Sequence, residues 1–192
     1  MSKFLIAGLG NIGTEYAGTR HNIGFDIAEA FVLKQQGNFR VSRLAEMAEI
    51  RWKGKQVILI KPTTYMNLSG KAVKYWMDVE KVPIEAVLII VDDVALPLNK
   101  VRLRPSGSHA GHNGLKSIQE SLLTVNYSKL RFGIGNDYPK GRQIEHVLGR
   151  WNSAEVPLVK LKIEKCVDII ESFISIGIER TMNDVNKLEF IL

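Results

Sequence analysis

Cysteine is almost absent from this chain, which has only Cys166 among its 192 residues. A single cysteine excludes an intramolecular disulfide and any metal site built from several thiolates. The apolar residues Ile163, Val167 and Ile170 recur around it at helical spacing, which predicts that the cysteine is buried on a helix. We therefore do not expect a reactive thiol.

Long apolar runs are also missing. The longer ones, such as Ala86 to Val91, fall far short of the ~20 residues that a membrane-spanning helix needs. Met1, Ser2 and Lys3 lead into a strand-like run, without the apolar segment and cleavage site of a signal peptide. We therefore expect no membrane association and a cytoplasmic location, or the interior of an organelle.

Acidic residues are fewer than basic ones, 20 against 26, which gives a formal net charge of +6. An excess of base favours a polyanionic partner only weakly, because it often does no more than solvate a surface. The placement of the basic residues is more informative. One part of the chain contains Lys100, Arg102, Arg104, Lys116, Lys129, Arg131, Lys140, Arg142 and Arg150. We expect these residues to form a phosphate-facing surface.

Strand-like and helix-like segments alternate along the chain, which predicts a single α/β domain over residues 1–192, with a mixed, twisted sheet flanked by helices. The expected strands are 4–7, 48–52, 56–60, 86–91, 101–104 and 129–135. The expected helices are 23–36, 71–79, 115–123, 144–148, 153–176 and 180–188. A hairpin turn is expected at Lys53-Gly54-Lys55, an N-cap at Ser69, and a loop over 106–114.

A glycine motif, Gly8-x-Gly10-x-x-Gly13, follows the first expected strand and matches the dinucleotide-binding fingerprint. In that fingerprint the third glycine opens a helix, and an acid ends the next strand about 20 residues later. Here Gly18 interrupts the segment before any helical pattern begins, and residues 39–43 are neither a buried strand nor followed by an acid. We interpret the glycines as tight turns and expect no cofactor, although an NAD(P)-dependent enzyme remains an alternative.

Histidine supplies the most informative polar pair. His21 lies in a polar loop beyond the first strand, and Asp92 ends the apolar strand 86–91, where α/β sheets place their sites. Such a pair predicts a general base held by a carboxylate, which can activate water. No G-x-S-x-G motif supplies a nucleophile. His109 and His112 alone are a weak metal signal, and we expect no metal site.

Three asparagines, Asn11, Asn67 and Asn113, follow or adjoin glycines in expected loops. Each could serve turn formation alone, since asparagine tolerates left-handed backbone conformations. Together with His21 and Asp92 they could instead offer amide groups to a peptide or a developing oxyanion. Tyr16 and Tyr65 could offer ring faces to a base or sugar, or could simply be half-buried.

Four blocks of sequence resemble the bacterial-type peptidyl-tRNA hydrolase family. The blocks are Gly8-Leu9-Gly10-Asn11 with Tyr16 and Thr19 to Phe25; Lys61 to Val73; Asp92-Asp93 before Leu96-Pro97; and Gly111 to Ile118 followed by Leu130 to Gly135. The resemblance covers nearly the whole chain. It implies a single α/β domain, usually monomeric, that cleaves the ester between a peptide and the 3′ end of tRNA without metal or cofactor.

The resemblance also implies roles for individual residues. It implies that His21 is the general base and that Asp92 holds it. Asn11 would contact the peptide, and Asn67 and Asn113 would contact the substrate and the water. Near the tRNA, Tyr16 and Tyr65 would lie beside the 3′ end, and Arg104 and Arg131 would clamp the 5′-phosphate. Departures from the family pattern occur at Ile12, Ala95, Asn99 and Ala110. A non-catalytic RNA-binding relative, as in organellar splicing, is the alternative that these residues leave open.

Overall fold

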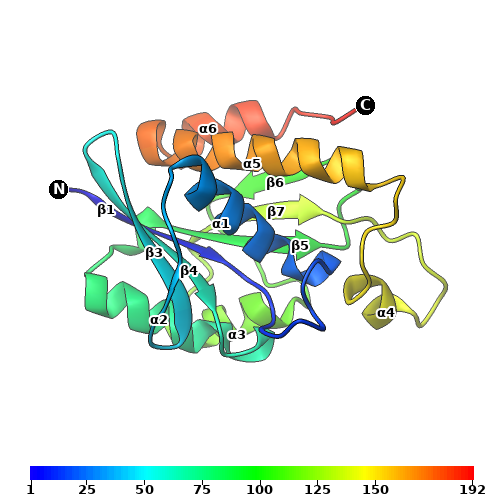
Figure 1. Ribbon diagram of the computed structural model, residues 1–192, viewed down its shortest axis with the longest axis horizontal. Coiled ribbons are helices and arrows are strands. Elements are labelled where there is room, and N and C mark those ends of the chain that lie inside the picture. The colour runs from blue at the N-terminus through cyan, green and yellow to red at the C-terminus, as the bar shows by residue number, and fades with distance from the viewer.

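Seven strands form one mixed sheet in the computed structural model, which describes residues 1–192 (Figure 1). The strand order is β2-β3-β4-β1-β5-β7-β6. The four central strands, β4 (Lys55–Pro62), β1 (Lys3–Gly8), β5 (Val87–Asp93) and β7 (Ser128–Gly133), run parallel to one another. The outer strands β3 (Ala45–Trp52), β2 (Arg40–Val41) and β6 (Val101–Arg104) pair antiparallel. The predicted mixed sheet is confirmed.

Helices cover both faces of this sheet (Figure 1). One face carries α1 (Ile23–Lys34), α5 (Val156–Ile176) and α6 (Ile178–Val185), and the other carries α2 (Ser69–Glu80) and α3 (Asn113–Leu122). Single 3₁₀ turns, η1 (Arg20–Asn22), η2 (Met66–Leu68) and η3 (Ile84–Ala86), precede α1, α2 and β5. The short α4 (Gln143–Val147) stands beyond the end of the sheet to which the central parallel strands point.

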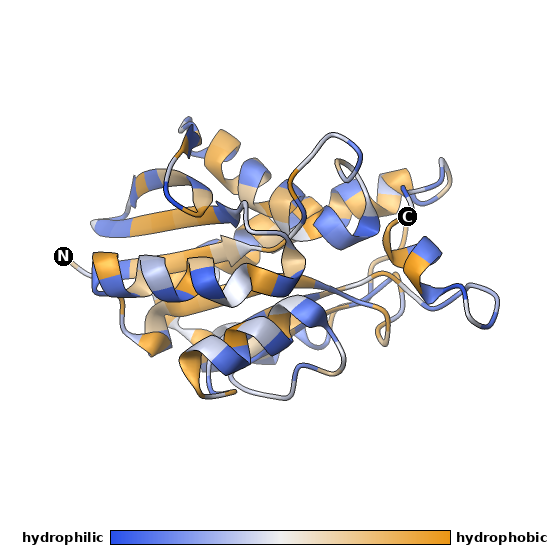
Figure 2. Ribbon diagram, turned by 90° about the horizontal axis from the view of Figure 1, so that it is seen from below, coloured by the Kyte–Doolittle hydropathy of each residue, from blue (hydrophilic) through white to orange (hydrophobic).

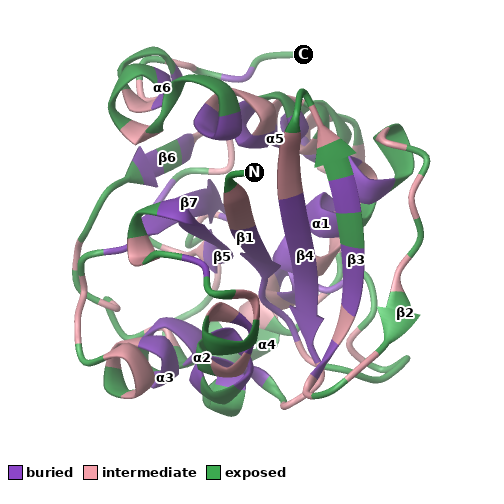
Figure 3. Ribbon diagram, turned by 90° about the vertical axis from the view of Figure 1, so that its left-hand side faces the viewer, coloured by how far each residue is buried: buried purple, intermediate pink, exposed green.

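The central strands are buried on both faces, as parallel strands between helices must be (Figure 3). On β1, Ile6 packs toward α1 and α5, while Leu5 and Ala7 pack toward α2 and α3. Complete burial of each such aliphatic side chain contributes about 1.5–3 kcal/mol. The helices carry mixed hydrophilic and hydrophobic residues, as Figure 2 shows from the side of α2 and α3. No helix is both long and apolar enough to cross a lipid bilayer.

Glycines let α1 approach the end of β1 more closely than other residues would permit. A Cβ on Gly8 would overlap the carbonyl of Gly24, and a Cβ on Gly24 would overlap the backbone of Leu9. Gly8 of the fingerprint-like motif therefore serves close contact between strand and helix. This contact places the N-terminal end of α1 directly beside the end of the sheet.

Two local expectations are wrong. Ser69 is the first residue of α2 and not its cap, because η2 runs directly into the helix and the Ser69 hydroxyl donates to the carbonyl of Met66 at 2.8 Å. The helix expected from 115 begins at Asn113, because the side chain of His112 caps it. The hairpin prediction is confirmed, since Lys53 and Gly54 both have positive φ angles.

The expectation that Lys129 belongs to a phosphate-facing surface is wrong. Its side chain is 0% exposed, and its Nζ donates to the carbonyls of Val125 and Tyr127 at 2.8 and 3.1 Å. Burial lowers the pKa of Lys129 to about 8. The alternation of apolar and basic residues along β7 cannot reveal that Lys129 is buried, because that strand is covered on both faces.

Lys162 is a second buried lysine. Its Nζ donates to the carbonyls of Leu98 and Gly133 and lies 3.7 Å from the centroid of the Phe132 ring. Burial lowers its pKa to about 7. Cys166 is also buried, as predicted, and burial raises the pKa of its thiol to about 12.

The edge strand β6 is covered by a side chain. The amide of Asn186, just beyond α6, accepts from the N–H of Leu103 at 2.8 Å and donates to the carbonyl of Leu103 at 3.0 Å. One asparagine side chain thus makes the pair of hydrogen bonds that a neighbouring strand would make. The opposite edge strand, β2, has two residues only.

Candidate active site

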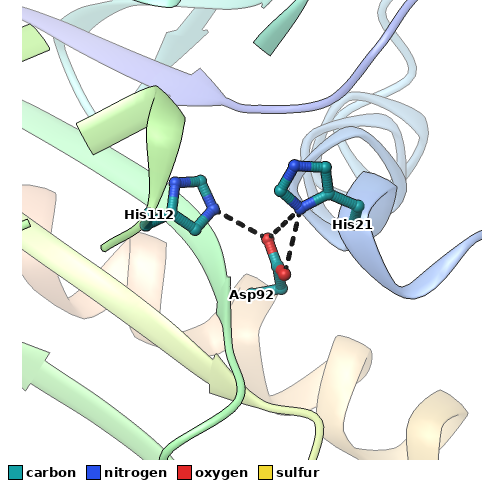
Figure 4. A group of neighbouring side chains, drawn as sticks. All are labelled: His21, Asp92 and His112. Carbon is teal, nitrogen blue, oxygen red and sulfur yellow. Dashed lines mark hydrogen bonds and ion pairs between the residues drawn. The ribbon is translucent and has the colours of Figure 1, made fainter. Parts of the chain in front are cut away.

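Three elements converge at the carboxyl ends of β1 and β5, which are neighbours in the sheet. The turn η1 supplies His21, the end of β5 supplies Asp92, and the residue before α3 is His112. Their side chains point toward one another (Figure 4). The predicted pair of His21 and Asp92 is therefore present, and a second histidine joins it.

Asp92 is the centre of this cluster and is 3% exposed. Its Oδ1 lies 2.9 Å from Nδ1 of His21 and 2.9 Å from Nε2 of His112, and its Oδ2 lies 3.1 Å from the same His21 nitrogen. Burial alone would raise the pKa of Asp92, but His112 and His21 outweigh it and lower this pKa to about 2. Asp92 is thus a carboxylate over the physiological pH range.

The ionised carboxylate determines the tautomer of His21. A carboxylate only accepts hydrogen bonds, so Nδ1 of His21 carries a proton and donates it to Asp92. In the neutral ring the unprotonated nitrogen is then Nε2, which points away from Asp92 (Figure 4) and has no hydrogen-bond partner in the protein. His21 has the arrangement of a general base with a free lone pair.

His112 is a member of the cluster that the sequence did not predict. Its Nδ1 accepts from the N–H groups of Gly114 and Leu115 at 3.1 and 3.4 Å, so its proton lies on Nε2 and is donated to Asp92. Histidine is not a favoured N-cap residue, and no spacing rule identifies this role. The only signal was its place directly before Asn113 in a block shared with a known family.

The ligand atoms of the three side chains lie within 4.8 Å of one another, which is close enough to share a metal ion. A metal-bound histidine normally donates its second ring N–H to an acceptor. Nδ1 of His112 faces two N–H donors instead, so a metal ion on Nε2 would place a proton against them. The donor set therefore fits a hydrogen-bonded cluster better than a metal site.

A cavity of about 410 Å³ opens beside the cluster. Its polar lining includes His21, Asp92 and the three predicted asparagines, Asn11, Asn67 and Asn113. Its apolar lining includes Val94 and three residues from the α4 region, Ile144, Val147 and Leu148. The structure thus brings six of the predicted site residues to one cavity, these five polar residues and Arg131.

Asn11 is held in a defined orientation. Its Oδ1 accepts from the N–H of Met66 at 2.7 Å, and its backbone N–H and carbonyl bond the side chain of the buried Asn22 at 2.8 and 2.9 Å. Because the oxygen of the Asn11 amide is engaged, its NH₂ group remains free to donate. Asn11 can therefore offer a hydrogen bond to a carbonyl oxygen in the cavity.

Of the predicted arginines and tyrosines, only Arg131 reaches the cavity. Arg131 lines the cavity and donates to the carbonyl of Ser108 at 2.8 Å. Arg104 is exposed on β6, Tyr16 is half-buried and Tyr65 is 52% exposed, and none of these three lines the cavity. The register of the sheet places Arg102 opposite Arg131, so the basic residues of β6 lie near the cavity's Arg131.

Two rim residues have unusual backbone angles. Tyr65 has φ 61° and ψ 160°, a region that glycine almost alone occupies, at a cost of about 1–3 kcal/mol. It stands directly before Met66, whose N–H holds Asn11. Ala110, one of the departures from the family pattern, also has a positive φ, 50°.

The fold and the cluster together define an α/β protein with a histidine–aspartate pair arranged as a general base for water. No serine, threonine or cysteine lines the cavity, so no side-chain nucleophile of these types stands beside His21. Amide groups of asparagine provide donors on the same side of the cavity.

Comparison with known proteins gives the family. The sequence model described as Peptidyl-tRNA hydrolase matches residues 5–190. Proteins named peptidyl-tRNA hydrolase from Parabacteroides distasonis and Porphyromonas gingivalis are 52% and 50% identical, each over 96% of this chain and 99% and 100% of their own length. A crystal structure of peptidyl-tRNA hydrolase from Acinetobacter baumannii has a TM-score of 0.91 at 34% identity, covering 97% of this chain and 95% of that one. The chain belongs to the peptidyl-tRNA hydrolase family.

Proposed function

We propose that the protein hydrolyses the ester bond that joins a peptide, or an N-blocked aminoacyl group, to the 3′ end of tRNA, and so releases tRNA for reuse in translation. The observation that carries the proposal is the free Nε2 of His21, with Nδ1 on Asp92, in a cavity that three asparagines share. Membership of the family supplies the substrate class.

The reaction begins when Nε2 of His21 takes a proton from a water molecule. The resulting hydroxide attacks the carbonyl carbon of the ester, and the carbonyl becomes an oxyanion. Asp92 stabilises the imidazolium through Nδ1, and the free NH₂ group of Asn11 is a donor for the carbonyl oxygens of the substrate. When the tetrahedral intermediate collapses, the imidazolium returns its proton to the ribose oxygen that leaves.

The remaining predicted residues act on the two ends of the substrate. Asn11 contacts the peptide and distinguishes an N-blocked group from a free amine, and Asn67 and Asn113 hold substrate and water. Tyr16 and Tyr65 lie near the tRNA 3′ end, and Arg104 and Arg131 bind the 5′-phosphate, which positions the substrate without reading its sequence. We further propose that the protein acts as a monomer in the cytoplasm, without metal or cofactor.

The test is hydrolysis of N-acetyl-aminoacyl-tRNA by the wild-type protein and by His21→Ala. General-base catalysis is worth about 10²–10⁴-fold, so His21→Ala should lose most turnover and still bind tRNA. His109→Ala is the matched control, because His109 lines the same cavity but bonds only the N–H of Gly111 in its own loop. Turnover of His21→Ala near the wild-type value would refute the mechanism, and an inactive wild-type protein would favour the RNA-binding alternative.

A further inference from the structure

The apolar side of the cavity belongs to a segment with little packing of its own. This segment, residues 136–151, contains α4, in which no residue is buried, and the side chain of Ile144 is 75% exposed. Yet Ile144, Val147 and Leu148 form one side of the cavity. Val147 and Trp151 pack only partly buried against the hydrophobic core, so a polar contact also holds the segment at its distance from His21.

That contact is Arg20, the residue before His21. It is only 8% exposed, and its backbone N–H donates to the carbonyl of Gly149 at 2.9 Å. Its Nη1 donates to the carbonyl of His146, at the C-terminal end of α4, at 3.0 Å. The backbone bond to Gly149 belongs to an isolated antiparallel bridge between Thr19 and Arg150. Arg20 thus bonds the end of α4 with both its backbone and its side chain.

The guanidinium also reaches the start of α5. Its Nη2 lies 3.0 Å from Oε2 of Glu155, and its central carbon lies 5.3 Å from the centroid of the Trp151 ring. Glu155 exchanges hydrogen bonds with Asn152 in a capping box, at 2.9 Å each, so its carboxylate is fixed by the helix start. Arg20 therefore holds α4 against a rigid element.

The side chain of His146 makes a second, separate anchor for the segment. Nε2 of His146 lies 3.0 and 3.2 Å from the carbonyls of Gly135 and Ile134, just beyond β7.

We propose that Arg20 is a positioning residue that fixes the apolar wall of residues 136–151 at its distance from the base His21. Arg20 and His21 are consecutive residues of the single turn η1, so the wall and the base share one support. The occupant between them is the acyl part of the substrate, whose apolar side chain packs on Ile144 and Leu148. The proposal rests on the proposed function for its substrate.

The test compares Arg20→Met with Arg20→Lys. Methionine keeps an apolar stem and the backbone donor but removes every side-chain donor, so we expect the KM for N-acetyl-aminoacyl-tRNA to rise about tenfold, with kcat within about threefold of wild type. Lysine retains one charged donor and should recover part of this loss. Hydrogen exchange should become faster in residues 136–151 and stay unchanged in the central strands.

A second variant and a control complete the experiment. Glu155→Gln keeps an oxygen for the capping box and removes the charge that Arg20 contacts, so it should give a smaller rise in KM and decides the matter if Arg20→Met fails to fold. Arg43→Met removes a guanidinium that lies over the Tyr75 ring, outside the cavity, and should change neither quantity.

Unchanged KM and unchanged exchange of residues 136–151 in Arg20→Met would overturn the proposal. So would a large fall in kcat at constant KM, since Arg20 would then act on the chemistry and not on the wall. If the wild-type protein hydrolysed nothing, the proposed function would fail, while faster exchange in residues 136–151 would still support the structural role of Arg20.

Discussion

His112 serves α3 and Asp92 with different ring nitrogens, so two substitutions can separate these roles. Its Nδ1 accepts from the first N–H groups of α3, and its Nε2 donates to Asp92 at 2.9 Å. Asparagine is among the best N-cap residues but is too short to make both contacts. His112→Asn should therefore keep the cap and lose the donor, whereas His112→Ala loses both.

The magnitudes follow from these contacts. A hydrogen bond to a charged group contributes about 1.5–3 kcal/mol, which corresponds to about 10–150-fold in rate if all of it acts in the transition state. Part of this free-energy contribution already orders Asp92 before the reaction. We therefore expect kcat to fall about tenfold in both variants, with KM unchanged. Loss of the cap costs about 0.5–2 kcal/mol of unfolding free energy, and only His112→Ala should show it.

The pH dependence has a definite sign. Burial favours protonation of Asp92, and His112 and His21 oppose it and lower its pKa to about 2. Without His112 this pKa must rise, so Asp92 becomes protonated at a higher pH and the acid limb of kcat moves upward. The stability that the low pKa of Asp92 confers, present above about pH 4 and lost toward pH 2, should shrink in the same way.

Release of N-acetyl amino acid from tRNA at saturating substrate, measured across the acid range, gives kcat and its acid limb. Urea unfolding gives the stability. The reasoning would be refuted by a His112→Asn variant with wild-type kcat and an unmoved acid limb. Equal losses of stability in the two variants would contradict the assignment of the cap to Nδ1.

Two further predictions concern stability. Burial lowers the pKa of Lys162 to about 7, so between about pH 7 and 10 the unfolded chain binds more protons and stability should rise with pH, by up to ~1.4 kcal/mol per unit. Lys162→Met should remove that rise. The prediction would be contradicted if urea unfolding of this variant gave the wild-type slope of unfolding free energy against pH. Gly24→Ala should lower the free energy of unfolding by about 2–3 kcal/mol, because the added Cβ overlaps the backbone of Leu9 and Ile90. In a helix, alanine is ordinarily more stabilising than glycine by about 1 kcal/mol. A gain in thermal stability would therefore show that the Cβ of residue 24 does not overlap the neighbouring backbone.

The layered fold was predictable because its signals are local. Apolar runs such as Ala86 to Val91 identify buried strands, and the spacing of Ile23, Ile27 and Phe31 identifies α1. The neighbouring ends of two parallel strands then place His21 and Asp92 together. The positions of these two residues needed only the topology of the sheet.

Other features depend on contacts between distant segments, which no pattern in the sequence contains. The cap that His112 makes requires a particular loop geometry, and the conformation of Tyr65 is one that its residue type argues against. Lys129 looked like a surface residue because charge usually lies outside, but its stem and ammonium are accommodated by carbonyls and the ring of Tyr127. Arg20 meets Glu155 across 135 positions of the chain.

Asn186 has a consequence for how the sheet ends. An edge strand with free N–H and carbonyl groups is a template on which another chain can add a strand. At β6 the amide of Asn186 already occupies both backbone groups of Leu103, and at the other edge β2 offers only two residues. A second copy of the protein could extend the sheet through β6 only by first displacing the side chain of Asn186. This side chain therefore protects the edge strand against strand addition between molecules.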